Sequence, residues 1–409
     1  MYVSVRGVPQ GGRSTTRVPR VVVVLGLVSL ITDVSTEMVT AVLPLFATLA
    51  LGLTPLAYGL LDGLHQGATV LVRLLGGFFA DRLRRPKLVA GTGYALGAAA
   101  KLMLFPAGGP AALSAAVAVD RAGKGLRTAP RDLLIATAAP RDRLGGCFGV
   151  HRALDATGAL LGPVVAFGLL ALAPGDFDMV FVVSFCVAVL GVLLFVHRVP
   201  EHRAERPAGP GGSRPISVRD IASLMRIGGF RRLLCAAALL SATTIGDTFL
   251  YLVLLRNEAV TTRWFPLLFV GTSLVYLSLA VPLGRISDRC GRNRVFTIGY
   301  GLLLCAYLTA MLIDGTTGAA LTLVFLGAYY AATEGVLSAA AAPLPPAELR
   351  ATGISVVQAA VAGGRALGAV TFGAIWTAAE SDTAVLAFAA ALTVALLAAV
   401  PMITRKEAR

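Results

Sequence analysis

Long apolar stretches recur along this chain of 409 residues and constrain its fold more than any other feature. A helix that crosses a bilayer needs about 20 mostly apolar residues. Because 56% of the residues are hydrophobic and only 14% are charged, a water-soluble globule is excluded. We predict an all-α membrane protein with twelve transmembrane helices. They cover residues 21–50, 56–80, 88–105, 111–138, 145–172, 178–197, 233–255, 265–284, 295–313, 317–341, 351–378 and 383–402.

The basic residues, which give a net charge of +14, gather in short segments between the apolar stretches. Connections rich in Lys and Arg face the cytoplasm. If the termini and the even-numbered connections lie there, only Arg256 and Arg263 fall in outer connections, which otherwise carry acidic residues. The pattern predicts a multi-pass protein of the cell inner membrane with both termini cytoplasmic. It does not favour binding to nucleic acid, because no nucleic-acid module accompanies the charge.

A short basic motif occurs twice, each time at the end of an apolar stretch. Its copies begin at Gly77 and Gly284, and Asp288 follows Asp81 by 207 residues (288 − 81 = 207). The same offset joins Arg143 to Arg350, Gly146 to Gly353 and His151 to Gln358. Repeats at one spacing indicate a duplicated domain. We therefore predict two six-helix bundles related by pseudo-symmetry.

The longest connection between apolar stretches divides the chain into these two halves. It is rich in Pro, Gly and Arg and ends in a predicted short helix at 218–227, which would turn Leu224 toward lipid. The predicted domains are a cytoplasmic tail (1–20), an N-terminal bundle (21–197), a cytoplasmic linker (198–232), a C-terminal bundle (233–402) and a cytoplasmic tail (403–409).

Charged residues within the first half suggest a site for chemistry. Asp33 and Glu37 share one face of the first span, and Arg121, Lys124 and Arg127 lie along the fourth. Counting about 1.5 Å per residue places Lys124 and Arg127 at the depth of the two acids. One hypothesis is that Asp33 or Glu37 exchanges protons while the cations modulate it or bind an anion. The alternative is a fixed ion pair between the two spans.

The second half offers fewer charges inside its spans. Asp247 and Arg365 lie at similar depth and are predicted to pair, in a coupling or a structural role. The five cysteines are scattered without ligand spacing, so neither a metal nor a cofactor is predicted. Because G-x-S-x-G, P-loop and H-E-x-x-H motifs are absent from the sequence, we predict that the protein is not an enzyme.

Taken together, these motifs resemble the major facilitator superfamily of transporters over almost the whole chain. Its loop signature, G-x-x-x-D-R-x-G-R-[KR], is matched best by Gly284 to Asn293 and, with Arg84 in place of the second glycine, by Gly77 to Pro86. The resemblance implies gating loops, with Asp132 as a partner of the first copy. The implied gating residues are Gly77, Asp81, Arg82, Asp132, Gly284, Asp288, Arg289, Gly291 and Arg292.

Two further motifs resemble parts of the same superfamily. The segment from Arg121 to Gly125 is similar to an R-x-x-[QK]-G motif that is tied there to proton coupling. In the fifth span, Gly149, Gly158, Gly162 and Pro163 follow the G-x8-G-x3-G-P pattern of bacterial drug/proton antiporters. The simpler interpretation of this pattern is close helix packing through small residues.

The resemblance implies a secondary transporter that works by alternating access, and proton-coupled efflux of a drug or metabolite is the function we favour. One alternative is proton-coupled uptake of a metabolite or metal chelate, and a minor one is a membrane sensor or scaffold without transport. Interior cations suggest an anionic or zwitterionic small-molecule substrate. The other expected partners are protons and the lipid bilayer, and the protein is expected to be a monomer.

Overall fold

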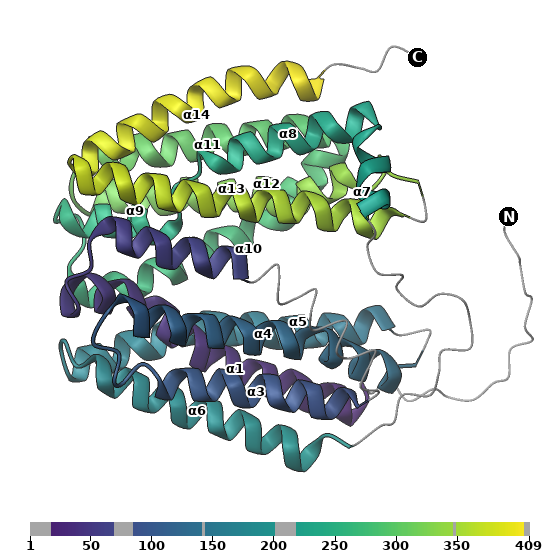
Figure 1. The fold of residues 1–409 in the computed structure, drawn as a ribbon, viewed down its shortest axis with the longest axis vertical. Helices are drawn as coiled ribbons and strands as arrows, with labels where there is room; N and C mark the ends of the chain where they lie inside the picture. Colours follow the sequence, from purple (N-terminus) through teal and green to yellow (C-terminus); the bar gives the residue numbers. More distant parts are fainter. Residues whose placement is uncertain (1–17, 69–84, 141–143, 201–217, 347–348, 405–409) are drawn as a thin grey trace, which may run out of the picture.

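The computed structural model describes residues 18–68, 85–140, 144–200, 218–346 and 349–404. All regular elements in these ranges are helical (Figure 1). In the first half they are α1 (Arg20–Leu45), the π-helical turn η1 (Phe46–Ala50), a helical segment at 55–68, α3 (Pro86–Leu102), α4 (Pro110–Ala138), α5 (Leu144–Leu172) and α6 (Phe177–Arg198). Proline in the first turn suits α3 and α4, because its fixed φ is helical and its missing N–H would have had no partner.

The second half continues this all-helical pattern. Its elements are α7 (Val218–Met225), α8 (Gly228–Ala242), α9 (Asp247–Arg256), the 3-10 turn η3 (Thr262–Trp264), α10 (Phe265–Cys290), α11 (Arg292–Leu312), α12 (Gly315–Ala341), α13 (Arg350–Ala378) and α14 (Ser381–Thr404).

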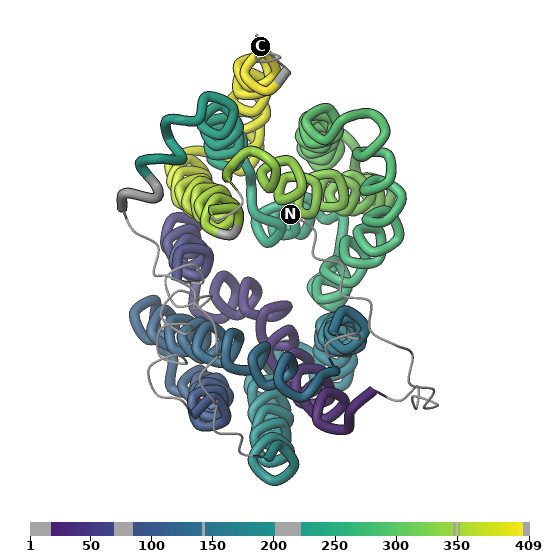
Figure 2. Tube along the Cα trace, turned by 90° about the vertical axis from the view of Figure 1, so that its right-hand side faces the viewer, coloured from purple at the N-terminus to yellow at the C-terminus, as the bar shows by residue number. Residues whose placement is uncertain are grey.

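Helices from each half of the sequence pack mainly against one another. In the first half α1 packs on α5 and α6, and α3 packs on α4 and α6. In the second half α12 packs on α10 and α11, and α8 packs on α13 and α14. Figures 1 and 2 accordingly show two groups of helices, one coloured purple to teal and the other teal-green to yellow. The second group lies above the first along the longest axis of the molecule. Contacts of two kinds join the groups: Leu56 of the helical segment at 55–68 donates to Thr377 of α13, and Phe167 of α5 stacks on Trp264 of η3.

Nine helices in the described ranges are long and apolar enough to cross a membrane. Three predicted spans are not among them. The stretch 56–80 lies partly outside the described residues, α3 has only 17 residues, and α4 carries too many charges. Twelve spans therefore remain a prediction. The nine helices are Arg20–Ala50, Leu144–Leu172, Phe177–Arg198, Gly228–Arg256, Thr262–Cys290, Arg292–Leu312, Gly315–Ala341, Thr352–Ala378 and Ser381–Ile403.

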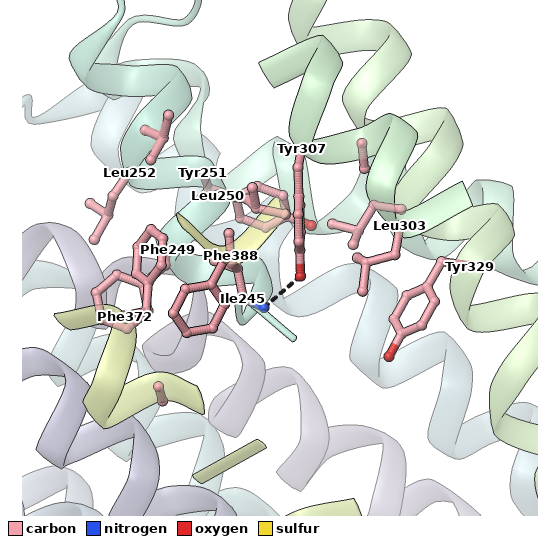
Figure 3. Packing of buried hydrophobic residues seen from close by; sticks show 14 of the residues in the cluster. Ile245, Phe249, Leu250, Tyr251, Leu252, Leu303, Tyr307, Tyr329, Phe372 and Phe388 are labelled. Carbon is pink, nitrogen blue, oxygen red and sulfur yellow. Dashed lines mark hydrogen bonds between the residues drawn. The ribbon is translucent and has the colours of Figure 1, made fainter. Parts of the chain in front are cut away.

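The predicted span at 233–255 is not one continuous helix, because α8 ends at Ala242 and α9 begins only at Asp247. Backbone groups freed by such a break need partners inside a membrane protein. Tyr307 supplies them: the Ile245 N–H donates to its hydroxyl at 2.7 Å, and this hydroxyl donates to the Thr243 carbonyl at 3.1 Å. Figure 3 shows Tyr307 reaching Ile245 across the buried aromatic cluster of this half. The break is thus a built feature of the fold.

The short helix α7 forms where the linker was expected to contain one, but the lipid-facing orientation of Leu224 was wrong. Leu224 is fully buried in the hydrophobic core, because α7 packs against α8 and α13. Protein, and not lipid, therefore covers this apolar side chain.

Candidate functional site

A cavity of about 280 Å³ lies between the two groups of helices. Its wall combines α1, the 55–68 segment, α3 and α4 with the α8–α9 break, α10, α12 and α13. An adjoining space of about 270 Å³ shares four lining residues with it. Ionisable groups inside a membrane protein are costly and commonly mark a functional site. The acidic, basic and histidine residues that line the first cavity are Glu37, Asp62, His65, Lys101, Asp120, Arg121, Asp247 and Arg365.

The predicted acids of α1 lie next to the predicted cations of α4. Arg127 donates to the Asp33 carboxylate at 3.1 Å, and Lys124 lies 3.9 Å from the Glu37 carboxylate. The two pairs differ in surroundings. Asp33 is only 5% exposed and does not line the cavity, whereas Glu37 does. Arg127 also stacks over the Tyr94 ring, 4.8 Å from its centroid, so its guanidinium is held on two sides. The arrangement separates a buried carboxyl from one that a substrate can reach.

Asp120 joins two buried cations on the same side of the cavity. Its carboxylate accepts from Lys101 of α3 and, at 2.6 Å, from Arg121. Lys101 is 3% exposed and Arg121 is 8% exposed, so neither cation is solvated by bulk water. The Arg121 Nε has no hydrogen-bond partner among the described residues. Arg121 therefore retains a donor for an anionic group in the cavity. The role of Lys101 was not predicted from the sequence.

Asp247 and Arg365 do not form the predicted ion pair. The Tyr330 hydroxyl donates to Asp247, while Arg365 donates to the Tyr329 hydroxyl at 3.3 Å and lies 5.5 Å above the Tyr330 ring. The pairing prediction was wrong because two tyrosines of α12 stand between the charges. Asp247 also starts α9, where the helix dipole favours a carboxylate. Both residues line the cavity, so the depth estimate held while the contact did not.

Two acids on this side had no role in the predicted site. Asp62 lines the cavity from the 55–68 segment, and its Oδ2 lies 3.1 Å from where a Cβ on Gly246 would stand. Glu334 lines the adjoining space. In the sequence each is an acid inside an apolar stretch, and this signal was sufficient to have included both residues in the predicted site. Within the described ranges, His, Cys, Asp and Glu form no group of three that could hold a metal ion.

Of the predicted gating residues, only the second copy and Asp132 can be placed. Gly77, Asp81 and Arg82 lie outside the described residues. Asp288 pairs with Arg292 at 3.1 Å, and Arg292 donates to the Ala339 carbonyl of α12 at 2.9 Å. Gly291 turns the chain between α10 and α11 with φ 99°, a value that favours glycine. Arg289 and Gly284 precede it on α10, and Asp132 pairs with Arg131 at 3.0 Å.

The glycine pattern of α5 places two of its three glycines against α1. A Cβ on Gly158 would stand 2.4 Å from the Leu30 carbonyl oxygen, and one on Gly162 would stand 2.7 Å from Glu37 Cβ. Gly149 has nothing within 4 Å of that position, so close packing does not explain it. Pro163 lies inside α5 next to Gly162. Tight α1–α5 packing fixes the position of the face that carries Asp33 and Glu37.

Gly158→Ala is expected to lower the free energy of unfolding by roughly 1–3 kcal/mol, because its methyl group must displace the α1 backbone. Unfolding of the detergent-purified protein measures this. Gly149→Ala is the matched control on the same helix, and it should cost nothing, since that methyl group meets open space. Equal stability of the two variants would contradict the packing argument.

The sequence matches the family model of the Major Facilitator Superfamily over residues 25–369 and, in a second match, 259–409. The chain belongs to the major facilitator superfamily. It is thus a transporter of this superfamily, with its charged cavity between the two helix groups. α1 and α4, which were predicted to carry charged residues at the same depth, bring these residues into contact.

Two relatives match this chain, and the first of them is named as an MFS-type transporter. An uncharacterised MFS-type transporter of Methanocaldococcus jannaschii is 25% identical over 83% of this chain and 84% of its own length. An uncharacterised protein of Mycobacterium tuberculosis is 37% identical over 154 residues, 37% of each chain.

Solved structures share the fold at low identity. A nucleoside transporter superposes with a TM-score of 0.81 at 15% identity, covering 94% of this chain and all of that one. A POT family transporter in complex with 5-aminolevulinic acid has a TM-score of 0.77 at 16% identity, covering 95% and 97%. At this identity the comparison supports the fold, and the substrate must be argued from this chain's own cavity.

Proposed function

We propose that this protein is a proton-coupled secondary transporter that exports a small zwitterionic molecule by alternating access. The observation that carries the proposal is the cavity itself, because charged side chains from both helix groups line it. A site formed by two groups of helices changes whenever the groups move relative to each other. Substrate and proton then shift the equilibrium between conformations through their different affinities for each.

The named contacts between the helix groups gather at one end of the molecule, which we call the closed end. Leu56 N–H donates to Thr377 at 2.8 Å, and Phe167 of α5 stacks on Trp264 with ring centroids 5.2 Å apart. Glycines allow the approach, since a Cβ on Gly59 would stand 2.5 Å from the Ala369 carbonyl. In alternating access this end must separate, so small residues here support a contact that forms and breaks.

A wedge at the closed end should change the conformational equilibrium. Gly59→Ala places a methyl group against the Ala369 carbonyl, and we expect the groups to separate there. Spin labels on Leu49→Cys and Glu380→Cys, with native cysteines replaced, report the separation by pulsed electron resonance. Gly67→Ala, which meets nothing within 4 Å on the same helical segment, is the control. Identical distance distributions in both variants would show that the contact does not hold this end closed.

The distribution of charge supports a zwitterionic substrate. On one side Lys101 and Arg121 outnumber Asp120, and Arg121 has a free donor. On the other side Asp62 and Asp247 face the same space as a single cation, Arg365, among the described lining residues of α9, α13 and the 55–68 segment. An anionic group fits the first side and an ammonium group the second.

Proton coupling is proposed for the acids of α1, Asp33 and Glu37, with Arg127 and Lys124 as their modulators. A carboxylate that pairs with a cation can exchange this partner for a proton, and the exchange changes the net charge next to the cavity. The Lys124–Glu37 separation of 3.9 Å, with 38% and 25% side-chain exposure, leaves this pair open to a substrate. A fixed structural clamp is the competing role.

Export is proposed because the Gly158, Gly162 and Pro163 pattern resembles drug/proton antiporters. Proton-coupled uptake is the alternative, since the cavity would serve either direction. We further propose the domain organisation stated above, with twelve spans, a monomer in the inner membrane, both termini cytoplasmic, and Asp81 and Asp288 in the gating loops.

Two measurements test the proposed function. First, a thermal-shift screen of purified protein uses compounds sorted by charge, because a ligand that binds the folded state stabilises it by mass action; zwitterions should give the largest shifts. Second, the best stabiliser is loaded into proteoliposomes with an imposed pH gradient. Accumulation against its own gradient only when proton flow is opposite to substrate flow supports antiport. Accumulation with protons flowing alongside indicates uptake, and accumulation independent of pH refutes proton coupling.

A further inference from the structure

The adjoining space of about 270 Å³ lies within the second group of helices. Its described lining residues come from α9, α10, α12 and α13, whereas the first cavity also takes residues from α1, α3 and α4. Asp247 and Arg365 line both spaces, so the two meet at the wall of the second group. A group bound in the adjoining space therefore keeps its contacts when the two groups of helices move relative to each other.

Aromatic rings form much of the lining of the adjoining space. Tyr251 of α9 stacks edge-on against Phe269 of α10, with ring centroids 4.8 Å apart and an angle of 81° between the rings. Tyr276 on α10 and Tyr330 on α12 also line this space. Aromatic rings attract a further ring in the same edge-to-face geometry. The lining therefore suits a planar aromatic group better than an aliphatic one.

The polar side chains of the lining differ in what they already bind. The hydroxyls of Tyr251 and Thr272 share a hydrogen bond of 2.6 Å, and the Tyr330 hydroxyl donates to Asp247. Glu334 lies one turn after Tyr330 on α12 and forms no ion pair with a Lys or Arg among the described residues. A carboxyl oxygen accepts a hydrogen bond whether or not the group is protonated. Glu334 can thus accept from a donor on a bound ring.

The residues shared by the two spaces place such a ring beside the proposed ammonium site. An ammonium group was assigned to Asp62 and Asp247, and Asp247 lies one turn before Tyr251 on the same face of α9. A ring joined to the ammonium group by a short chain can therefore reach the aromatic lining. Arg121 lines only the first cavity, so the anionic end of the ligand stays there.

We propose that the substrate is a zwitterion whose ammonium end carries an aromatic ring, and that the adjoining space binds this ring. Glu334 accepts a hydrogen bond from a hydroxyl or amino group on the ring. The substrate class is then that of aromatic amines with an additional anionic group. The inference rests on the proposed function, whose ammonium site it extends. During alternating access the ring stays with the second group of helices, while the anionic end gains or loses its contact with Arg121 of the first.

Calorimetric titration of the purified full chain with four amines tests the ring site. The probes are tyramine, tyramine methyl ether, phenethylamine and cyclohexylethylamine, which share an ammonium group and lack a carboxylate. Phenethylamine should bind roughly 2- to 10-fold more tightly than cyclohexylethylamine, because only a planar aromatic ring gains the edge-to-face contacts. Tyramine should bind roughly 10-fold more tightly than its methyl ether, because the ether has no hydrogen to donate to Glu334.

Two variants assign these preferences to the lining. Glu334→Leu should remove the advantage of tyramine over its methyl ether and leave the affinity for phenethylamine unchanged. Tyr276→Leu should reduce the advantage of phenethylamine over cyclohexylethylamine. Glu380→Leu, the same change at an exposed position, is the control and should leave all four affinities unchanged. Thermal melting confirms that each variant folds, and the wild-type series decides the ring preference even if one does not.

The outcomes separate this proposal from the proposed function. Equal affinities of the wild-type protein for phenethylamine and cyclohexylethylamine, or no binding of any of the four amines, would overturn the ring site. A tyramine preference that persists in Glu334→Leu would overturn the role of Glu334. Since the titration needs neither a carboxylate nor a pH gradient, a ring preference without proton-driven transport would refute the proposed function and leave the ring site intact. Proton-driven transport of zwitterions without a ring preference would do the reverse.

Discussion

Asp120→Asn is expected to lower the free energy of unfolding by about 3–5 kcal/mol, because it leaves two buried cations without their carboxylate. Lys101 and Arg121 are 3% and 8% exposed, so water cannot replace the lost charge. The carboxylate also connects α3 to α4, and its loss removes a contact between two helices. Unfolding of the detergent-purified protein, followed by intrinsic fluorescence during denaturant titration, measures the change.

Two further variants show whether burial is the cause. Asp288→Asn removes an ion pair whose carboxylate is 64% exposed, and should cost no more than about 1 kcal/mol. Lys101→Met combined with Asp120→Asn removes one of the two stranded cations and should recover part of the loss. If Asp120→Asn and Asp288→Asn cost the same, the buried cations are solvated and our account of this cluster is wrong.

Most helices could be predicted because a bilayer allows few alternatives for long apolar stretches. The α1–α4 contact could also be anticipated, since both helices are continuous where they carry charges and depth follows from counting residues. Asp33 with Arg127, and Glu37 with Lys124, therefore lie together as their spacing predicts.

Counting residues along a span failed to predict contacts where a helix is interrupted or where a third side chain lies between two charged residues. No proline marks the break between α8 and α9, which depends on Tyr307 from a helix more than 60 residues away in sequence. Tyr329 and Tyr330 take the hydrogen bonds that Asp247 and Arg365 were expected to give each other. A tyrosine in an apolar stretch is interpreted from the sequence as a packing residue, because its hydrogen-bond partners are known only from the structure.

Asp62 and Asp155 show a different limit of sequence reasoning. Both are acids inside apolar stretches. Arg152 precedes Asp155 by three residues, whereas Asp62 has no Lys or Arg at helical spacing. Their partners come from other helices: Asp62 faces the α8–α9 break, and Asp155 faces Ser29 and Arg131. The packing of α5 against α1, which Gly158 and Gly162 permit, brings Asp155 to Ser29.

Asp62→Asn and Asp247→Asn are each expected to weaken binding of a zwitterion roughly 10- to 100-fold, since a charge-assisted hydrogen bond contributes about 1.5–3 kcal/mol. Both carboxylates line the cavity, so an ammonium group can contact them directly. Calorimetry with the best zwitterionic stabiliser of the wild-type protein gives the dissociation constants. An analogue whose amine is acetylated serves as the matched ligand, and its affinity should change little in either variant.

The same logic assigns the opposite end of the ligand to Arg121. Arg121→Gln should weaken the zwitterion and its acetylated analogue alike, because both keep the anionic group. Asp382→Asn, at an exposed position on α14, should leave all affinities unchanged. If instead the acidic variants weaken the acetylated analogue as much as its parent, the ammonium group does not bind at Asp62 and Asp247. The two walls of the cavity would then not distinguish the two charges of the ligand, and a neutral or purely anionic substrate would account better for the results.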